Sequence, residues 1–294
     1  MRSFDQFFTG TARECLERAV DLALYEDGPD RTSEAIFSPS DILRAVIVAK
    51  QDSLVAGLPV ADVVFARMGI LDLVTRRYHA REGLRVPSGT VVAEFTGPAA
   101  GLLGAERVIL NFFCHMCGVA NMTSRHAGAL SGGSAMLLDT RKTLPGLRYP
   151  AKYAVRVGGG HNHRMNLSDM LMLKDNHIDR AGGVPSAVRA VRRVHPAGSI
   201  PLEVECRTLE EVRQAVALTP ERIMLDNMTP DQMREALSLI PQSIETEISG
   251  GVTLEALPSL GELGARFVSV GRITHSAPYA DFSMRMTPIE RSFS

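Results

Sequence analysis

The second half of the chain, from residue 135 to residue 270, alternates short apolar runs with amphipathic segments. The runs typical of strands cover residues 135–138, 170–173, 202–206, 223–225, 244–248 and 267–270. The segments typical of helices cover residues 186–195, 208–218, 230–240 and 253–263. Repeated alternation of strand and helix predicts a parallel sheet, and for a chain of this length a βα barrel is its best closed form.

The first part of the chain follows a different pattern. Residues 11–25 place Leu16, Val20 and Leu24 on one side of an amphipathic helix. Between residues 44 and 95 the β-rich runs RAVIVAK, ADVVFARM, LDLVTRRY and GTVVAEF alternate with Gly and Pro, which predicts a small sheet with some helix. Residues 101–129 lack Pro and are apolar on several faces, so we expect one long buried helix there.

Composition excludes several classes of protein. The formal net charge of -1 argues against nucleic acid as the main partner. Four cysteines in 294 residues do not make a disulfide framework, which indicates a reducing, cytoplasmic compartment. The N-terminus lacks the long apolar stretch of a signal peptide, and no window of about 18 uninterrupted apolar residues predicts a membrane span. Cys114 and Cys117 lie inside the long apolar helix, where buried packing is the better interpretation than redox or zinc chemistry.

Polar residues and glycines lie at the end of each expected strand or follow it. They are Arg141 and Lys142 after the first strand, Lys174 after the second, Glu205 near the end of the third, Asp226 and Asn227 after the fourth, Ser249, Gly250 and Gly251 after the fifth, and Gly271 after the sixth. In a βα barrel these strand ends meet at the rim that carries the chemistry. We therefore expect segments far apart in the sequence to form one site.

Positive charge is concentrated in the segment from Arg141 to His177. This segment holds seven Lys or Arg, two acidic residues and three His, although the whole chain is nearly neutral. Arginine binds carboxylate or phosphate through two parallel hydrogen bonds, and lysine supplies a point charge. The segment therefore predicts a site for a multiply anionic small molecule; the alternative is solvated surface charge.

Two glycine-rich segments and two carboxylates complete the pattern. Residues 158–160 form a Gly triplet before His161 and His163, where a zinc pair is disfavoured by the neighbouring Arg164. Residues 249–251, before the helix expected from residue 253, are a candidate phosphate cradle, with an ordinary turn as the alternative. Glu205 and Asp226 suit Mg²⁺ or sugar hydroxyls, or else they pair with the rim cations.

At this point the residues match a known family. The segments DTRKTLPGLR, GGGHNHR, KDNHI, LDN, SGGV and VGRITHSAP, in this order, closely resemble the quinolinate phosphoribosyltransferases, the carboxylating nicotinate-nucleotide pyrophosphorylases. The resemblance extends upstream through AERVILNFF at residues 105–113 and covers nearly the whole chain. It departs from the family pattern at Cys117 and Asn121, and in a shortened EDGPDRT segment at residues 26–32.

The resemblance implies an N-terminal α/β sandwich at residues 1–108, an incomplete α/β barrel at residues 109–276, and a tail at residues 277–294 that returns to the first domain. It implies a homodimer, or an assembly of dimers, with shared active sites. The implied reaction belongs to de novo NAD biosynthesis. It joins quinolinate to phosphoribosyl pyrophosphate in the presence of Mg²⁺ and gives nicotinate mononucleotide, pyrophosphate and CO₂.

Roles for individual residues follow from the same resemblance. Quinolinate would be bound by Arg107, Arg141, His163, Arg164 and Lys174, with Arg107 supplied by the partner subunit. Phosphoribosyl pyrophosphate would be bound by Lys142, Glu205, Asp226, Asn227, Ser249, Gly250, Gly251, Gly271 and His275. The catalytic residues would be Lys142, Lys174, Glu205 and Asp226, and the two carboxylates would also hold Mg²⁺, directly or indirectly.

Two alternatives remain open on the sequence alone. One is the ModD-like branch of the same fold, which is associated with molybdate uptake genes and would take another anionic ring or base. The full cationic set favours quinolinate over that reading. The other is a non-catalytic phosphosugar-binding paralogue, against which the presence of both Glu205 and Asp226 argues.

Overall fold

The computed structural model describes residues 3–289 and divides into two compact units. Of the described residues, 3–123, 143–159 and 274–289 form the first unit, and residues 124–142 and 160–273 form the second. This division differs from the expected boundaries after residues 108 and 276. The helix α5, Ala99–Ala129, continues past the first boundary, and residues 143–159 fold with the first unit.

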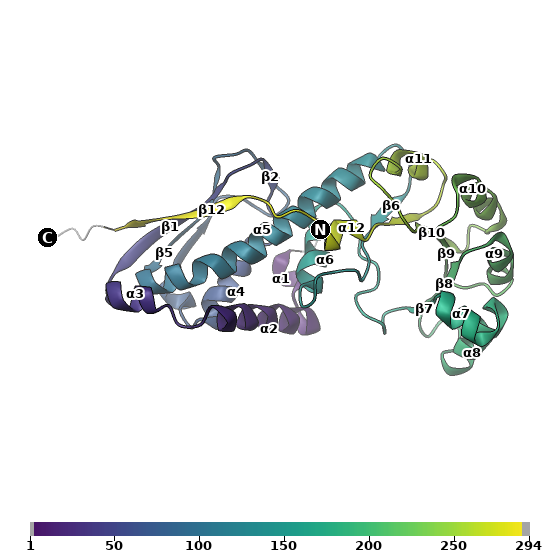
Figure 1. Ribbon diagram of the computed structural model, residues 1–294, viewed down its shortest axis with the longest axis horizontal. Coiled ribbons are helices and arrows are strands. Elements are labelled where there is room, and N and C mark those ends of the chain that lie inside the picture. The colour runs from purple at the N-terminus through teal and green to yellow at the C-terminus, as the bar shows by residue number, and fades with distance from the viewer. Residues whose placement is uncertain (1–2, 290–294) are drawn as a thin grey trace. The chain divides into compact units, whose positions relative to one another are not determined.

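The first unit is built on a four-stranded antiparallel sheet (Figure 1). Its order is β12 (Phe282–Pro288), β1 (Ile42–Ala49), β5 (Val91–Pro98) and β3 (Thr75–Tyr78). β12 pairs with β1 along its whole length, from Ala49 opposite Phe282 to Leu43 opposite Pro288. This is the segment for which the resemblance implies a return to the first domain, and residues 290–294 of it lie outside the described residues.

Helices and two short strands complete the first unit. They are α1 (Phe4–Phe7), α2 (Gly10–Asp27), α3 (Arg31–Ile36), α4 (Val60–Arg67), a 3-10 helix η1 (Leu71–Leu73), most of α5, α6 (Arg148–Val157) and the second half of α12 (Arg272–His275), with the ribbon β2 (Ser53–Leu54) and β4 (Arg85–Val86). The helix expected at residues 11–25 is confirmed by α2, which buries Leu16 and Val20. The apolar core includes Ile47 and Phe95, neither of which is exposed.

The β-rich interpretation of ADVVFARM is wrong, because residues 60–67 form the helix α4. Val63, Val64 and Phe65 are almost completely buried, and the Phe65 ring meets Phe95 edge-on at 5.2 Å between centroids. Burial on several sides of a short helix favours the same Val and Phe residues that a strand favours. Packing therefore overrides the local propensity.

The long helix α5 confirms the expectation of one extended buried helix at residues 101–129. It is long and apolar enough to cross a membrane, the one such helix among residues 3–289, yet 72% of its most apolar window is buried. That degree of burial is typical of a helix at the centre of a folded domain. Cys114 and Cys117 are both buried free thiols on this helix, as their packing interpretation predicts.

The two departures on α5 have structural partners within the first unit. Asn121 Oδ1 accepts from the Leu54 amide at 2.8 Å, and its Nδ2 donates to Ser53 Oγ at 2.7 Å. Cys117 Sγ accepts from the Ala56 amide at 3.3 Å. Both residues therefore hold the segment around β2, which needs such partners because its backbone is buried.

The second unit contains a six-stranded parallel sheet. Its strands are β6 (Met136–Leu138), β7 (Leu171–Leu173), β8 (Leu202–Cys206), β9 (Arg222–Asp226), β10 (Glu245–Ser249) and β11 (Phe267–Ser269). Each lies within about a residue of its expected position, and the order β6-β11-β10-β9-β8-β7 places consecutive strands side by side from β7 to β11. β6 pairs with β11, as closure of a barrel requires, and among the described residues it does not pair with β7. The sheet is therefore an incomplete barrel, open between its first two strands, as the resemblance implies.

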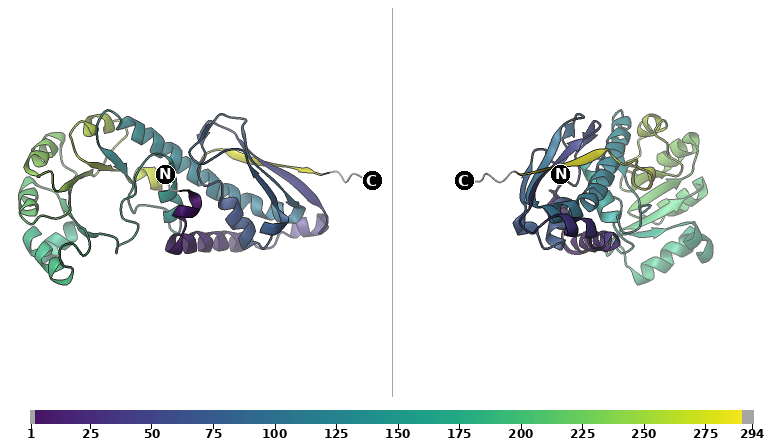
Figure 2. Two further views of the ribbon diagram at one scale, coloured as in Figure 1. Left: turned by 180° about the vertical axis from the view of Figure 1, so that it is seen from behind. Right: turned by 60° about the vertical axis from the view of Figure 1, so that its left-hand side comes forward.

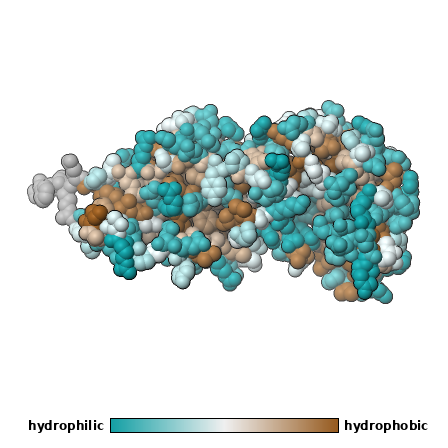
Figure 3. All heavy atoms as spheres, viewed as in Figure 1, coloured by the Kyte–Doolittle hydropathy of each residue, from teal (hydrophilic) through white to brown (hydrophobic). Residues whose placement is uncertain are grey.

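Helices cover the outer side of this curved sheet (Figures 1 and 2). They are α7 (Asp175–Ala181), α8 (Val184–Val194), α9 (Leu209–Val216), α10 (Pro230–Leu239) and α11 (Leu257–Gly261). Their outward surface is mainly hydrophilic in the view of Figure 3. The capping interactions expected at Thr208 and Thr229 are present, since each side chain accepts from the backbone amide three residues later.

The helix expected to start at residue 253 begins only at Leu257. Pro258 occupies the first turn of α11. A proline lacks the backbone N–H and is tolerated in the first turn of a helix, so Pro258 accounts for a helix that starts four residues later than expected. The glycine turn at residues 249–251 is therefore separated from the helix that follows it.

Candidate active site

The carboxyl ends of the six parallel strands carry most of the polar residues singled out in the sequence. Glu205 lies within β8, Asp226 is the last residue of β9, and Ser249 is the last residue of β10. Lys174 directly follows β7, and residues 140–142 follow β6 after Asp139. The topology of the strands thus brings residues that lie more than 100 positions apart in the sequence to one edge of the sheet.

A cavity of about 280 Å³ opens at this edge. It is lined by Thr140, Arg141, Lys142, His163, Arg164, Met172, Lys174, Glu205, Met224, Glu247, Ser249 and Ser269. Seven of these residues were predicted from the sequence to bind substrate. Asp226, Asn227, Gly250, Gly251 and Gly271 lie in the same unit, next to lining residues or at strand ends, but they do not line the cavity itself.

Two arginines, Arg141 and Arg164, line the cavity. The Nε atom of Arg141 is buried and has no hydrogen-bond partner. Burial, followed by the nearby positive charge of Arg141, lowers the pKa of the Arg164 guanidinium. Two like charges held close together in a partly buried cavity repel each other, so a bound anion would relieve the repulsion and satisfy the open donor.

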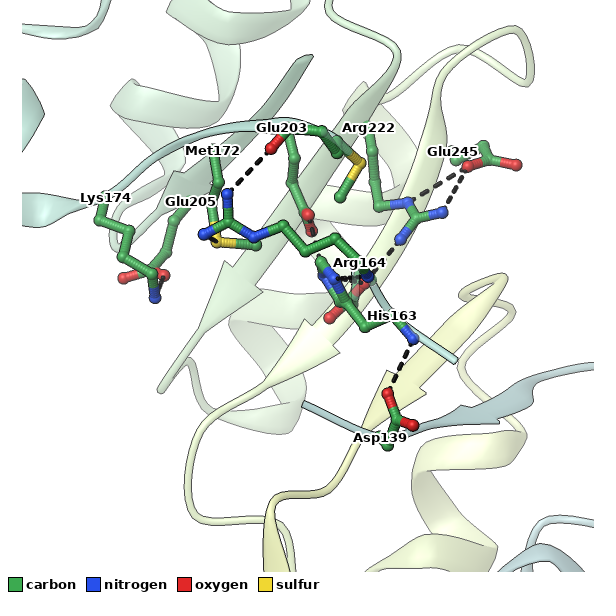
Figure 4. Close-up of polar contacts among 11 residues, drawn as sticks. Asp139, His163, Arg164, Met172, Lys174, Glu203, Glu205, Arg222 and Glu245 are labelled. Carbon is green, nitrogen blue, oxygen red and sulfur yellow. Dashed lines mark hydrogen bonds and ion pairs between the residues drawn. The ribbon is translucent and has the colours of Figure 1, made fainter. Parts of the chain in front are cut away.

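Lys174 and Glu205, which both line the cavity, form an ion pair. The Lys174 Nζ lies 3.0 Å from Glu205 Oε2, and the Glu205 side chain is only 10% exposed (Figure 4). This contact agrees with the alternative that a rim carboxylate pairs with a rim cation. A half-exposed lysine remains free to turn toward a ligand, because a pair of this kind contributes little stability.

Asp226 is held by its neighbour. The side-chain amide Nδ2 of Asn227 donates to Asp226 Oδ2 at 2.6 Å, and the Asn227 backbone amide donates to the Ser249 carbonyl at 3.1 Å. Asn227 has a positive φ of 55°, which asparagine tolerates better than most residues. The bend at Asn227 therefore links the end of β9 to the end of β10 and orients the carboxylate between them.

The glycine turn after β10 is packed against this bend. Gly250 has a φ of 92°, and a β-carbon there would lie 2.6 Å from Asn227 Cγ. Gly251 also has a positive φ, of 58°. Consecutive residues in such a turn can direct backbone N–H groups toward an anion. The turn therefore still agrees with the phosphate-cradle hypothesis, although no helix begins directly after it.

The Gly-rich loop that carries His163 and Arg164 is fastened to the residue after β6. Asp139 is fully buried, and its carboxylate accepts from the His163 backbone amide at 2.9 Å and from Asn162 Nδ2 at 2.7 Å. The Asp139 backbone amide in turn donates to the His161 carbonyl at 3.1 Å. The loop therefore enters the cavity at a fixed position.

Sequence reasoning missed the charged residues beneath the cavity. Glu203 and Glu247 have no exposed surface, and His163 Nε2 lies 3.0 Å from Glu203 Oε2 and 3.6 Å from Glu247 Oε2. Burial raises the pKa of Glu203 to about 7, and burial together with the negative charge of Glu203 raises the pKa of Glu247 to about 7. The available signal was the alternation in LEVEC and ETEIS, which puts a carboxylate on the inner face at every second residue.

His163, Glu203 and Glu247 have the composition of a three-ligand metal site. Arg222 Nη1, however, lies 3.1 Å from Glu247 Oε2 and already supplies a positive charge there. A fixed guanidinium competes with a metal ion for the same carboxylate. His161, the other histidine of the zinc pair that the sequence disfavours, is exposed and does not belong to the cluster.

Two predicted residues belong to the first unit. Arg107 is an exposed residue of α5 whose Nη2 lies 3.8 Å from Glu106 Oε1. His275 ends α12, and its Nδ1 lies 2.6 Å from Ser276 Oγ. Their roles toward a ligand stay predictions.

Comparison with known proteins gives a consistent result across the chain. The model for the N-terminal domain of quinolinate phosphoribosyl transferase matches residues 30–117, and the model for its C-terminal domain matches residues 119–285. A relative in Bacillus subtilis, described as a probable carboxylating nicotinate-nucleotide pyrophosphorylase, is 42% identical over 260 residues, which is 88% of each chain. The carboxylating nicotinate-nucleotide pyrophosphorylase of Mycobacterium leprae is 38% identical over 93% of this chain and 96% of its own.

A solved structure supports the same relationship. The crystal structure of NadC from Streptococcus pyogenes superimposes with a TM-score of 0.89 at 38% sequence identity. The match covers 96% of this chain and all of that one. The sequence comparison and the fold comparison therefore indicate the same family, and both cover residues of the two units.

Proposed function

The chain belongs to the quinolinate phosphoribosyltransferase family, and from this premise we propose how its residues carry out the family's reaction. The chain is a pentosyltransferase that joins quinolinate to phosphoribosyl pyrophosphate and yields nicotinate mononucleotide, pyrophosphate and CO₂. The observation that carries the residue assignment is the cavity of the second unit, where Arg141, Arg164 and Lys174 converge and Arg141 keeps an open donor.

Quinolinate is a pyridine with two neighbouring carboxylates, and we assign its binding to the cationic side of the cavity. Arg141 and Arg164 face the two carboxylates, His163 and Lys174 lie beside them, and Arg107 is contributed from a partner subunit. Two guanidinium groups suit two carboxylates, because each pair forms parallel charge-assisted hydrogen bonds. The repulsion between Arg141 and Arg164 supports this assignment, since a dianion removes it.

Phosphoribosyl pyrophosphate takes the other side of the cavity in this proposal. Glu205 and Asp226, at the ends of neighbouring strands, hold the ribose hydroxyls, and Lys142 lies by the pyrophosphate. Asn227, Ser249, Gly250, Gly251, Gly271 and His275 surround the 5′-phosphate. The two positive-φ glycines support the phosphate assignment, because they leave the backbone accessible to the anion.

Mg²⁺ fits the same carboxylates. It prefers one or two carboxylates together with phosphate oxygens, and Glu205 and Asp226 on adjacent strands supply such a pair. When bound, the ion neutralises charge that develops on the departing pyrophosphate. Lys174, now paired with Glu205, is released toward the substrates in this scheme.

The chemistry follows from where charge develops. The pyridine nitrogen forms a bond to ribose C1′ while the bond from C1′ to the pyrophosphate oxygen breaks. The leaving group gains negative charge, and Lys142 stabilises it more in the transition state than before. Cleavage of the bond to the 2-carboxylate then leaves an electron pair on C2 beside the positive ring nitrogen, and a proton from water takes the place of CO₂.

Assembly and location are further parts of the proposal. A homodimer would bring Arg107 of one subunit to the cavity of the other, which agrees with the high exposure of that side chain. The four free cysteines suit a reducing, cytoplasmic compartment.

The direct test mixes the full-length protein with Mg²⁺, phosphoribosyl pyrophosphate and quinolinate, and follows nicotinate mononucleotide by chromatography. We expect product with quinolinate and none with nicotinate, because nicotinate lacks the 2-carboxylate that the second arginine binds. Equal use of nicotinate would contradict the diacid assignment. Tight binding of phosphoribosyl pyrophosphate without any product would favour the non-catalytic alternative.

A further inference from the structure

The floor of the cavity is made of charged side chains for which the reaction gives no role. Glu203 and Glu247 project from β8 and β10 on the inner face of the sheet, and neither has any exposed surface. The inner face of a closed βα barrel is normally filled with branched apolar side chains. Buried carboxyl groups are costly unless they are paired, so their presence below the ligand cavity needs a reason.

The imidazole of His163 lies between these carboxyl groups and the main chain. Its Nδ1 accepts a hydrogen bond from the Arg164 backbone amide at 2.7 Å, so Nδ1 carries no hydrogen. The ring hydrogen of the neutral imidazole is then on Nε2, which lies 3.0 Å from Glu203 Oε2 (Figure 4). The same Nε2 lies 3.6 Å from Glu247 Oε2. A second ring hydrogen on Nδ1 would point at the Arg164 N–H, and the two donors would repel each other.

Arg222 holds Glu247 in place from the next strand. Its Nη1 lies 3.1 Å from Glu247 Oε2, its Nη2 lies 2.8 Å from Glu245 Oε2, and its guanidinium stacks 4.3 Å from the centroid of Phe267. These three contacts fix the Arg222 guanidinium, so any movement of the Glu247 carboxylate would break its contact with Arg222. The position of Glu247 is therefore restrained by Arg222, a residue of the same sheet.

The chain of contacts ends at the guanidinium that the proposed function assigns to quinolinate. Arg164 Nη1 donates to the Met170 carbonyl at 2.9 Å, and Nη2 lies 3.6 Å from Met172 Sδ. The backbone amide of Arg164 is bound to the imidazole, and its guanidinium is bound to the residue before β7. These two contacts leave the Arg164 side chain little conformational freedom. Rotation of the imidazole would release the first of these two restraints.

We propose that Glu203 and Glu247 are positioning residues that hold the His163 ring as its neutral Nε2–H form and, through it, aim Arg164 into the cavity. His163 thus contributes hydrogen-bond geometry and not positive charge. The role given to Arg164 rests on the proposed function, whereas the state of the imidazole does not. The two parts can therefore fail separately.

The state of the imidazole is tested in the full-length protein labelled with ¹⁵N-histidine. Nitrogen spectra at neutral pH report which ring atom carries hydrogen, and His163→Gln identifies the signal. We expect one histidine fixed with hydrogen on Nε2 alone, and loss of that fixed form in Glu247→Gln. A His163 ring that carries hydrogen on Nδ1, or on both nitrogens, overturns the proposal, as does stoichiometric binding of added Zn²⁺ at this ring.

The effect on Arg164 is tested by steady-state kinetics. Glu247→Gln should raise the KM for quinolinate about tenfold while the KM for phosphoribosyl pyrophosphate changes less than about twofold. Glu245→Gln is the matched control, since Glu245 binds the same Arg222 and does not contact His163. Equal KM values in the two variants overturn the positioning role.

A second variant guards against a folding defect. If Glu247→Gln melts well below the parent protein, Glu203→Gln is measured instead, since Glu203 forms the shorter contact with His163. A parent protein that makes no nicotinate mononucleotide would refute the proposed function, while the nitrogen spectra would still decide the state of His163.

Discussion

The two larger sheets of the molecule bury different kinds of side chain. In the first unit, β1 and β5 bury Ala45, Ile47 and Phe95 with no exposed surface. In the second unit, the inner face of β8 and β10 buries Glu203 and Glu247. Side chains alternate along a strand, so the buried apolar residues Val204 and Ile248 of the same strands lie on the other face. The packed face of the first sheet therefore contributes to stability. In the second sheet one face contributes to stability and the other carries the candidate site.

This contrast has an energetic side. Apolar burial contributes about 25 cal/mol for each Å² removed from water, whereas a buried carboxyl group costs free energy unless it is paired. In the second unit Arg222 offsets part of that cost at Glu247. Substitutions on the inner face should therefore change activity more than stability, and substitutions in the first sheet should do the opposite.

The largest effect is expected at Arg141. Arg141→Ala removes a guanidinium with an open buried donor, so we expect kcat/KM for quinolinate to fall about 10³-fold, comparable to the loss of a key transition-state donor. The melting temperature should stay within a few degrees of the parent. Initial rates and a thermal melt check both parts, with Arg189→Ala, an exposed arginine on α8, as the control.

Full activity in Arg141→Ala would break the assignment of the cavity as the quinolinate site. A comparable loss in Arg189→Ala would show that general charge, and not the site, is responsible.

The second prediction concerns the first sheet. Ile47→Ala leaves a void in a fully buried position of β1, so we expect the free energy of unfolding to fall by about 3 kcal/mol. Both KM values should stay unchanged in the folded fraction. Chemical denaturation and kinetics on the same preparation measure the two quantities, and a raised KM at unchanged stability would contradict the division of roles.

Much of this architecture is readable from the sequence because parallel strands buried on a helix-covered face leave strong apolar runs. The runs at residues 202–206 and 244–248 locate β8 and β10 to within a residue. The polar residues that follow such runs then fall on one rim by topology alone. Arg141, Lys142, Lys174, Glu205 and Ser249 were found in this way, and all five line the cavity. His163 and Arg164 also line it, but they were found from the cationic segment and the family resemblance.

The misses have two physical causes. Residues 60–67 form α4 although Val and Phe favour strands, because burial on several sides outweighs propensity. Glu203, Arg222 and Glu247 escaped notice because alternating charged and apolar residues are typical of a strand with one face in water. Only the curvature of the sheet, which turns that face inward, makes them buried.

A smaller effect is expected at the glycine turn. Gly250→Ala places a β-carbon against the side chain of Asn227 and strains a positive φ, so the bend that orients Asp226 should shift. We expect the KM for phosphoribosyl pyrophosphate to rise about tenfold with the KM for quinolinate nearly unchanged. Gly198→Ala is the control, because Gly198 also has a positive φ but nothing within 4 Å of a β-carbon. Equal kinetic changes in both variants would show that backbone strain alone, and not the contact with Asn227, matters.

The smallest effect is a dependence of stability on pH that belongs to the second sheet. Burial and the charge of Glu203 raise the pKa of Glu247 from 4.5 to about 7, so the folded protein keeps a proton that the unfolded chain has already released. The contribution of that proton to stability is complete below pH 4.5 and is lost as the pH rises toward 7. We expect the free energy of unfolding of the parent, relative to Glu247→Gln, to fall by on the order of 1 kcal/mol between pH 5 and 7.5. Chemical denaturation of both proteins across this pH range measures the difference. A difference that stays constant or grows with pH would mean that Glu247 is ionised in the folded protein. The effect of Arg222 on the pKa of Glu247 would then outweigh the effect of burial.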